Sequence, residues 1–454
     1  MTATLLINGN IIDGTGAAPR KGSVLLRDDC IVAVGAEADA QAPLDPACVR
    51  LDASGKTVMP GLIDGHCHIS FDEPNSNDEL FFHRRHGLSA IVAAQNTQKL
   101  LRAGVTGFMD ADSIFEIGVD LRDAIEAGIV SGPRMSTGGY ALWTSVGGTA
   151  GRLIPDEGVR GYGKVVNSKA EIVAEVRRQI KQGVDWIKVH VTGIVPRHPL
   201  RGEVKAWTFD ELKLVCDTAH ELGIPVLGHC RGANSIVECV DAGMDLILHA
   251  TLMDERALEK VVEKKVPIMP VFTFQANLAD YGQAVGADPV VREMFRREIA
   301  DSCAMLRRAF DAGVPLLCGS ESGFSITPYG EWHYKELEVF VRDLGLSPLQ
   351  AIHCATQQNA FSLRLPGRTG VIAAGQLADV IVVDGDPSKD VTLLGRQAII
   401  QHVFVGGRQV SLASPAPRRD PPGWRVSTYG GRLSRAVALG NAPLDPPVLP
   451  EHEI

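Results

Sequence analysis

The stretch VMPGLIDGHCH, residues 58–68, decides how the rest of the chain is interpreted. Its apolar residues lead directly into two histidines, His66 and His68, which are separated by one residue. Because alternate residues of a β-strand point to the same face, both imidazoles would leave the end of this strand in one direction. A His-x-His pair is common by itself, but one that ends a buried strand is a more specific signal. We therefore treat the pair as candidate metal ligands.

Seven further short apolar segments follow this strand, and helical sequences separate them. The helices begin with capping sequences, such as Ser168 with Glu171 and Thr208 with Glu211. Strands that alternate with helices are typical of parallel β/α construction, and eight of them make a (β/α)₈ TIM barrel. The expected strands are residues 61–68, 105–111, 134–140, 184–190, 225–230, 245–250, 266–272 and 314–321.

Both ends of the chain differ from this α/β pattern. They contain short strands broken by Gly, Asp and Pro at turn positions, without a helical period. We expect the two ends to pair into one small β-sandwich domain, followed by an extended, proline-rich C-terminal tail. The expected domains are residues 1–60 with 366–411 for the sandwich, 61–365 for the barrel and 412–454 for the tail.

The bulk composition restricts the class of partner. The chain has 454 residues, 45% of them hydrophobic and 22% charged, with a formal net charge of −9. Its basic residues are scattered, which argues against binding to nucleic acid or to an anionic membrane. The nine cysteines include no CxxC pair, and no 18-residue apolar span or leader sequence occurs. We expect a cytoplasmic protein with reduced core thiols, a small-molecule substrate and a homo-oligomeric state.

Lys188 lies near the end of the expected strand 184–190, on the face that would point into the barrel. An unpaired ammonium buried there would be costly and would tend to lose its proton. A neutral amine can react with CO₂ to form a carbamate, whose two oxygens can bridge two metal ions. The alternative is a lysine at the rim of the barrel with its amine in water.

His229 and His249 end the next two expected strands, at the end of the barrel where such enzymes place their chemistry. Each alone could be a core histidine held by hydrogen bonds. Four histidines and one lysine at the same end of strands one, four, five and six are hard to obtain by chance. They predict a site for one or two divalent cations, with zinc as the default and cobalt or manganese as alternatives.

At this point the chain resembles the amidohydrolase superfamily over nearly its whole length. The resemblance runs from LLINGNIIDG (5–14) through the opening stretch to GQLADVIVVDGDP (375–387). Within the superfamily the chain is similar to the branch of Xaa-Pro dipeptidases, ochratoxin-type N-acyl amidases, and phenylurea and molinate hydrolases. The segments that carry this second likeness are WIKVHVTG, PVLGHC and LILHAT.

The resemblance implies a role for each candidate ligand. Lys188 would be carboxylated on its side-chain nitrogen. His66 and His68 would bind the more buried metal, and His229 and His249 the more exposed one.

Two positions depart from the family's pattern. Members usually end strand eight with an aspartate, where this chain has Glu321 in CGSES. We expect Glu321 to take a proton from the attacking water and to pass it to the leaving nitrogen. Dipeptidase-like members carry a histidine after strand three, where this chain has Thr149. A donor to the substrate carbonyl would then come from elsewhere, with His190 and Tyr140 as candidates.

Segments expected at the barrel mouth are rich in aromatic residues and contain few charges. Hydrophobic walls favour an uncharged or aromatic substrate such as an aryl urea, an anilide or an N-acyl aromatic amide. Cations in the loop after strand four, such as Arg197, could instead bind a substrate carboxylate. The expected substrate contacts are Tyr140, Trp143, Thr149, Arg197, Phe272, Phe324 and His333.

The expected function is hydrolysis of the C–N bond of an amide, urea or carbamate by water that the cation activates. Glu321 and His190 are the expected catalytic residues. A dipeptidase or N-acyl-amino-acid amidase is the alternative within enzymes. A non-catalytic scaffold that kept the fold is the alternative from another class, although the complete ligand set argues against it.

Overall fold

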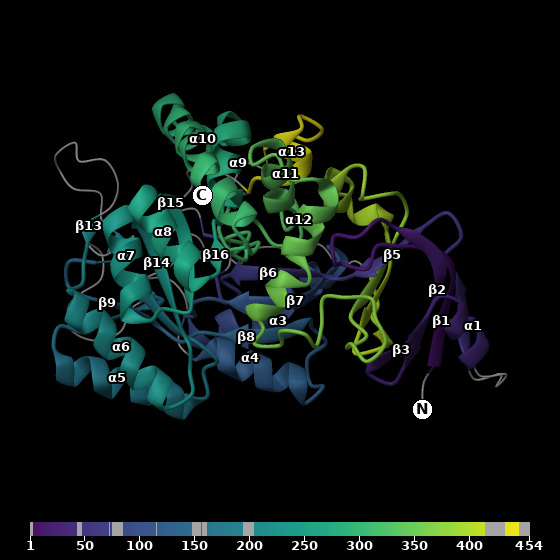
Figure 1. Ribbon diagram of the computed structural model, residues 1–454, viewed down its shortest axis with the longest axis horizontal. Coiled ribbons are helices and arrows are strands. Elements are labelled where there is room, and N and C mark those ends of the chain that lie inside the picture. The colour runs from purple at the N-terminus through teal and green to yellow at the C-terminus, as the bar shows by residue number, and fades with distance from the viewer. Residues whose placement is uncertain are drawn as a thin grey trace, which may run out of the picture.

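The body of the protein is built from short parallel strands that alternate with helices along most of the chain (Figure 1). The computed structural model describes residues 3–42, 48–71, 73–74, 85–114, 116–147, 156, 161–193, 204–413 and 432–444. The strands of the body are β6 (Leu62–Cys67), β7 (Val105–Asp110), β8 (Arg134–Thr137), β9 (Ala141–Trp143), β10 (Gly163–Val165), β11 (Ile187–His190), β14 (Val226–Gly232), β15 (Leu246–Leu252) and β16 (Ile268–Met269).

These strands close into the predicted barrel. β6, β7 and β8 form one parallel sheet, and β11, β14, β15 and β16 lie in order within a second. Isolated parallel bridges join the two sheets and insert the eighth expected segment between β16 and β6, which confirms the fold class. The closing bridges pair Gly138 with Trp186, Ile268 with Leu316, and Cys67 with Ser322.

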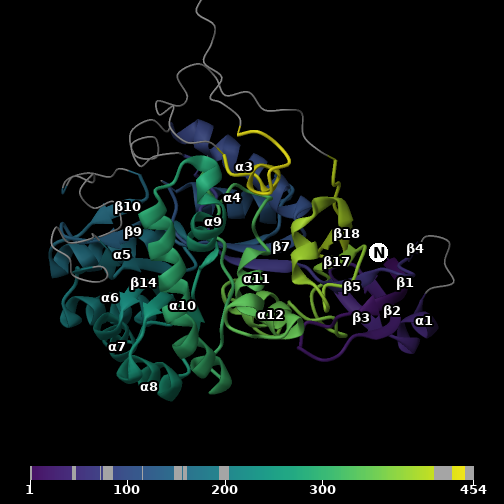
Figure 2. The same cartoon turned by 90° about the horizontal axis from the view of Figure 1, so that it is seen from above.

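Helices cover the outside of the barrel (Figure 2). The capping prediction is confirmed at two of them, because Ser168 accepts from the Glu171 N–H and Thr208 forms a full capping box with Glu211. The helices are α3 (His86–Arg102), α4 (Ile117–Glu126), α5 (Lys169–Gln182), α6 (Phe209–Glu221), α7 (Ala233–Ala242), α8 (Glu255–Lys264), α9 (Thr273–Tyr281), α10 (Pro289–Asp311), α11 (Lys335–Arg342) and α12 (Pro348–Ala355).

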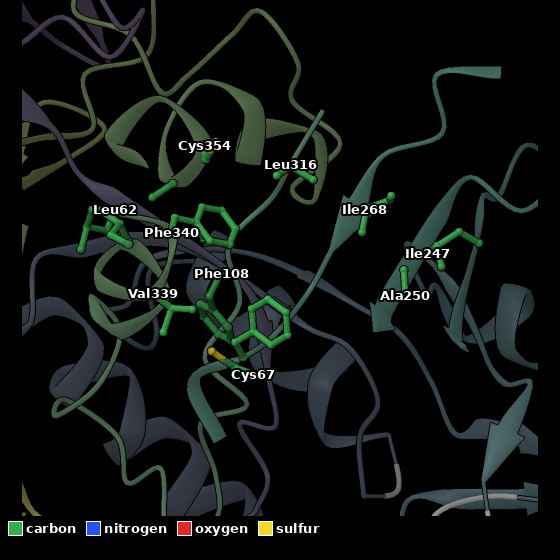
Figure 3. Packing of buried hydrophobic residues seen from close by; sticks show 14 of the residues in the cluster. Leu62, Cys67, Phe108, Ile247, Ala250, Ile268, Leu316, Val339, Phe340 and Cys354 are labelled. Atoms are coloured by element: carbon green, nitrogen blue, oxygen red, sulfur yellow. The ribbon is translucent and has the colours of Figure 1, made fainter. Parts of the chain in front are cut away.

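Strand alternation divides the apolar residues into two layers. Outward-facing residues such as Phe108 and Ile268 pack against the helices, and Figure 3 shows Phe108 beside Val339 and Phe340 of α11. The other strand face fills the barrel and forms an apolar floor. Its members include Met109, Trp186, Leu227, Leu246, Leu248, Met269 and Leu317. All nine cysteines are free thiols, and all but one of them are buried.

Both chain ends contribute to one eight-stranded sheet beside the barrel (Figure 1). The last N-terminal strand, β5, pairs parallel with β1 and antiparallel with β17, so it joins the two ends and then leads into β6. The sheet domain from both ends is therefore confirmed. Its strands are β1 (Ala3–Ile11), β2 (Arg20–Arg27), β3 (Cys30–Val34), β4 (Val49–Asp52), β5 (Thr57–Pro60), β17 (Val380–Val383), β18 (Ile400–Val405) and β19 (Arg408–Gln409).

Residues 432–444, which include helix α13 (Arg435–Ala438), pack on the segment that follows the eighth barrel strand. The Leu433 N–H donates to the Ser325 carbonyl at 2.9 Å, and the Trp332 indole donates to the Leu433 carbonyl at 2.9 Å. Arg432 forms an ion pair with the buried Glu73 at 2.8 Å. This part of the C-terminal segment thus holds two loops at one end of the barrel. Among the described helices, none is long and apolar enough to cross a bilayer.

Leu433→Ala is expected to lower the free energy of unfolding by about 2–5 kcal/mol, the usual cost of truncating a fully buried leucine. The Leu433 side chain is buried completely, at 0% exposure. Leu439→Ala on the same segment is the control, because Leu439 is 48% exposed and should change stability by less than about 0.5 kcal/mol. Urea unfolding followed by fluorescence measures both. Equal effects of the two substitutions would show that Leu433 does not anchor the segment.

Candidate metal centre

Four histidines from the carboxyl ends of three barrel strands meet over the apolar floor. His66 lies next to His68 with ring centroids 5.0 Å apart, and next to His249 at 6.0 Å. His229 meets His249 edge-on at 4.4 Å. All four side chains are buried. The structure thus brings together the four imidazoles that the sequence placed at this end of the barrel.

Glu321 of the eighth barrel strand faces the first two imidazoles. Its Oε2 lies 3.4 Å from His66 Nε2, and its Oε1 lies 3.3 Å from His68 Nε2. The ligand atoms of these three residues lie within 4.8 Å of one another. The Glu321 N–H donates to the His66 carbonyl at 2.9 Å, which fixes the two strands relative to each other. Two imidazole nitrogens and a carboxylate therefore converge on one point.

Two of these imidazoles, those of His66 and His249, have ring nitrogens that the described residues do not satisfy. Both ring nitrogens of His249 and the Nδ1 of His66 are buried without a hydrogen-bond partner. Burial lowers the pKa of His66 to about 3 and the pKa of His249 well below its ordinary value. Neutral imidazoles with buried, unpaired nitrogens are unusual in proteins and are the form that binds metals. These residues fit a divalent transition metal such as zinc, cobalt or manganese.

Lys188 lies inside the barrel and not at its rim, since its side chain is 1% exposed. The alternative of an amine in water is therefore wrong. Burial lowers the pKa of Lys188, while the Asp112 carboxylate, 3.7 Å from its Nζ, acts in the opposite direction. Trp186, two residues earlier on the same strand face, belongs to the apolar floor beneath it.

Asp112 is a member of this cluster that sequence reasoning missed. Its Oδ1 lies 2.6 Å from His68 Nδ1, and its Oδ2 lies 3.3 Å from His190 Nε2. Burial raises the pKa of Asp112, but the neighbouring His68 and Lys188 charges lower it further, to well below its ordinary value. The available signal was the segment MDADS, which places an acidic residue just beyond β7.

Aromatic residues form a wall beside the imidazoles, which we call the aromatic wall. The His190 ring stacks on His229 at 4.8 Å and meets Trp143 edge-on at 5.2 Å. The His68 ring stacks on Phe71 at 4.5 Å and meets Phe324 at 5.6 Å. The predicted residues Trp143, His190 and Phe324 thus lie at the cluster. Phe71 and Tyr162 also lie there but were not singled out from the sequence. The aromatic wall consists of Phe71, Trp143, Tyr162 and Phe324.

Three other predicted substrate contacts have partners elsewhere. Arg178 of α5 lies over the Tyr140 ring at 5.5 Å, on the helix side of the barrel. Phe272 is fully buried in the main core. His333 Nδ1 lies 2.7 Å from Asp64, and its Nε2 accepts from the Gly330 N–H at 2.9 Å. The remaining two candidates, Thr149 and Arg197, lie outside the described residues.

His333 pairs with Asp64, and this carboxylate contacts the cluster. That carboxylate accepts from the His66 N–H at 3.2 Å and from the Ser320 N–H at 3.0 Å. It therefore joins the strand end that carries His66 to the residue before Glu321. The pair of His333 and Asp64 supports the cluster from behind.

The backbone is strained where strands six to eight end. His249 has φ 71°, Val271 has φ 57° and Glu321 has φ 56°, values that residues with a Cβ rarely adopt. Leu248 already belongs to the barrel floor, so regular alternation would turn His249 outward. The left-handed conformation interrupts this alternation and allows His249 to join the other imidazoles. Strain of this kind gathers at functional sites.

Another buried carboxylate, that of Glu336, lies behind the site. The pH dependence of the free energy of unfolding tests its protonation state. Glu336 accepts from the Thr273 N–H at 3.0 Å, and burial raises its pKa to about 8. Between its unfolded pKa of 4.5 and about 8, the folded state holds a proton that the unfolded state has lost. Its contribution to stability is therefore complete below pH 4.5 and falls as the pH rises towards 8, by about 1.4 kcal/mol per pH unit.

Glu336→Gln is expected to remove this slope, because the amide imitates the protonated acid at every pH. Relative to the parent protein, the variant should gain stability between pH 5 and pH 8, on the order of 1 kcal/mol or more. Urea unfolding at both pH values measures the difference. Glu331→Gln, whose carboxylate is partly exposed, is the control. A constant stability difference across this pH range would contradict the assignment.

Comparison with known proteins places this geometry in a family. Residues 57–410 match the Amidohydrolase family. Ochratoxinase of Aspergillus niger is 26% identical over 428 residues, which cover 89% of this chain and 86% of the relative. The family match spans the barrel and the sheet-domain strands β5, β17, β18 and β19.

Solved structures give the same result. A prolidase in complex with N-methylphosphonate-L-proline has a TM-score of 0.76 and 27% identity, over 90% of this chain and 99% of its own. Molinate hydrolase, at 24% identity, shares the fold with a TM-score of 0.74 over 92% of this chain and 99% of its own. These proteins lie in the branch that the sequence resemblance indicated.

Proposed function

Because this chain belongs to the amidohydrolase family of hydrolases that act on carbon–nitrogen bonds, we propose that it cleaves the amide, urea or carbamate bond of an apolar or aromatic small molecule. The observation that carries the proposal is the convergence of His66 and His68 on the Glu321 carboxylate, beside buried ring nitrogens of His66 and His249 that have no hydrogen-bond partner among the described residues. A non-catalytic scaffold would have no reason to keep such unsatisfied groups.

We propose that His66, His68, Lys188, His229 and His249 hold one or two divalent cations, with zinc as the default. Lys188 would bind as a carbamate, since burial favours the neutral amine that reacts with CO₂. When bound, a divalent cation lowers the pKa of water and polarises a carbonyl oxygen. The chain's own residues supply the remaining steps.

Glu321 is placed to move the proton. It takes a proton from the attacking water and delivers it to the leaving nitrogen, so that the amine departs neutral. Burial would raise its pKa, but the charges of His66 and His68 lower it further, to well below its ordinary value. The carboxylate is therefore ionised at neutral pH and available as a base. His190, whose pKa burial lowers to about 4, stays neutral beside Asp112.

The aromatic wall favours an uncharged, aromatic substrate. Its rings lie against His68 and His190, so a substrate whose carbonyl reaches the cluster would place its apolar part on this wall. The similar proteins include an ochratoxinase, a prolidase and a molinate hydrolase, and their names do not agree on one substrate. The proposal of an uncharged, aromatic substrate therefore rests on the aromatic wall.

The second candidate is a dipeptidase or N-acyl-amino-acid amidase, which the 27% identity to a prolidase favours. Such substrates carry a carboxylate, which would need a cation near the imidazoles. In the described part of the chain Arg231, two residues after His229, lies near His249 but forms an ion pair with Glu298. Its charge is therefore already matched.

A hydrolysis screen tests the proposal. Protein loaded with zinc, cobalt or manganese is assayed with aryl ureas, anilides, aryl carbamates, N-acyl amino acids and Xaa-Pro dipeptides. We expect the highest kcat/KM for uncharged aryl substrates, and Trp143→Ala should raise KM for these. Turnover of carboxylated substrates only would select the second candidate. Stoichiometric metal without hydrolysis of any C–N bond would overturn the proposal.

A further inference from the structure

The carboxylate of Asp112 contacts side chains from two barrel strands. Asp112 follows β7, and its side chain is completely buried. One oxygen lies 2.6 Å from Nδ1 of His68, which follows β6. The other lies 3.3 Å from Nε2 of His190 and 3.7 Å from Nζ of Lys188, both on β11. The two oxygens of Asp112 thus face different strands.

These contacts determine which nitrogen of each imidazole carries the proton. An ionised carboxylate only accepts hydrogen bonds, so a His68 ring that binds a cation through Nε2 would turn its Nδ1–H towards Asp112, whose Oδ1 lies 2.6 Å away. Its Nε2 is then left with a lone pair, and this is the nitrogen that lies 3.3 Å from Glu321 in the candidate ligand group. By the same argument, His190 presents Nε2–H to Asp112. His190 in turn stacks on the candidate ligand His229.

We propose that Asp112 is a positioning residue of the metal centre. It fixes the tautomer and ring orientation of His68 as a ligand, and it holds His190 as the support on which the His229 ring rests. The inference rests on the proposed function, because it requires a cation at the histidine cluster. Carboxylates that accept from a ligand histidine in this way typically contribute about 10- to 100-fold to metal affinity.

Two substitutions test the inference by metal binding, without reference to activity. Asp112→Ala removes both acceptors, and we expect its affinity for zinc to fall by about 10- to 100-fold, measured by competition with a chromophoric chelator. Asp112→Asn keeps one acceptor oxygen but turns an amide donor towards the other imidazole, so its affinity should lie in between. The visible absorption of the cobalt-loaded protein reports whether the coordination geometry has changed.

Asp379→Ala is the matched control. Asp379 is also a buried carboxylate, and it pairs with Arg134 at 2.6 Å and accepts from Thr369 at 3.0 Å next to β17 of the sheet domain. Its loss should lower stability but leave zinc affinity and the cobalt spectrum unchanged. A reduced affinity in the Asp112 variants but not in this control separates positioning from a general loss of stability.

The outcomes distinguish the inference from the proposed function. Wild-type protein that binds zinc stoichiometrically, together with an Asp112→Ala variant of equal affinity and an unchanged cobalt spectrum, would overturn the role of Asp112 alone. Wild-type protein that binds no transition metal would overturn the metal centre itself. Equal losses of affinity in Asp112→Ala and Asp379→Ala would also count against a positioning role.

Discussion

Lys188→Ala is expected to lower kcat by on the order of 10³-fold or more, and a short carboxylate such as acetate or propionate in the assay should restore part of the activity. The lysine is 1% exposed and lies 3.7 Å from Asp112. Loss of the proposed carbamate ligand weakens the binding of the cation, and with it the polarisation of the substrate, which is worth several kcal/mol, at about 1.36 kcal/mol for each tenfold in rate. Steady-state kinetics with and without the added acid, beside metal analysis, measure the effect.

The partial rescue distinguishes a carbamate from an ordinary buried lysine. The space that the side chain leaves can admit a small acid, whose two oxygens imitate those of a carbamate. Lys335→Ala is the control, because Lys335 is equally buried but forms ion pairs with Asp280 at 2.9 Å and Glu338 at 2.8 Å. That variant should lose stability without any response to acetate. Full activity of Lys188→Ala would refute the role of the lysine.

The barrel could be predicted from the sequence because its determinants are local. Most strands are short apolar runs that a helix follows, and the order of the barrel strands largely follows the order of the chain. His66, His68 and His229 could be placed for the same reason, since a residue at the end of a strand in a parallel barrel lies at the mouth. Periodicity alone thus gave the correct position for most of the cluster.

The remaining parts of the site depend on contacts that periodicity does not contain. His333 and Asp64 are 269 residues apart, and only the folded barrel shows that they pair with each other. Asp112 and Tyr162 lie in connections between strands, where neither strand alternation nor a helical period fixes the direction of a side chain. Tyr140 was misplaced because its ring packs under Arg178 of a surface helix.

His249 was located correctly, but regular alternation does not explain its direction. Its neighbour Leu248 belongs to the barrel floor, so regular alternation would point His249 outward. The left-handed backbone at His249, with φ 71°, interrupts this alternation and turns the imidazole towards the cluster. A sequence gives no local sign of such a conformation in a residue other than glycine. The similar strain at Glu321 shows that two site residues adopt backbone conformations that only the surrounding barrel can impose.

Glu321→Gln is expected to lower kcat by about 10²- to 10⁴-fold, the range for loss of a general acid–base residue. The substitution keeps the length of the side chain and one oxygen towards His66 and His68, so metal content should remain near that of the parent. What it removes is the capacity to accept a proton. Rate measurements at saturating substrate, with metal content determined on the same samples, test this expectation.

Glu321→Asp separates the effect of removing the carboxylate charge from the effect of shortening the side chain. Its carboxylate can still accept a proton, but it ends one methylene short of the point between His66 and His68, and a displacement of about 1 Å costs roughly 10²-fold. The aspartate variant should therefore retain more activity than the glutamine variant. The opposite order, or a glutamine variant within tenfold of the parent at equal metal content, would show that another group moves the proton. His190 and Asp112 are candidates for this role, since both lie within the same buried cluster and are hydrogen-bonded to each other at 3.3 Å.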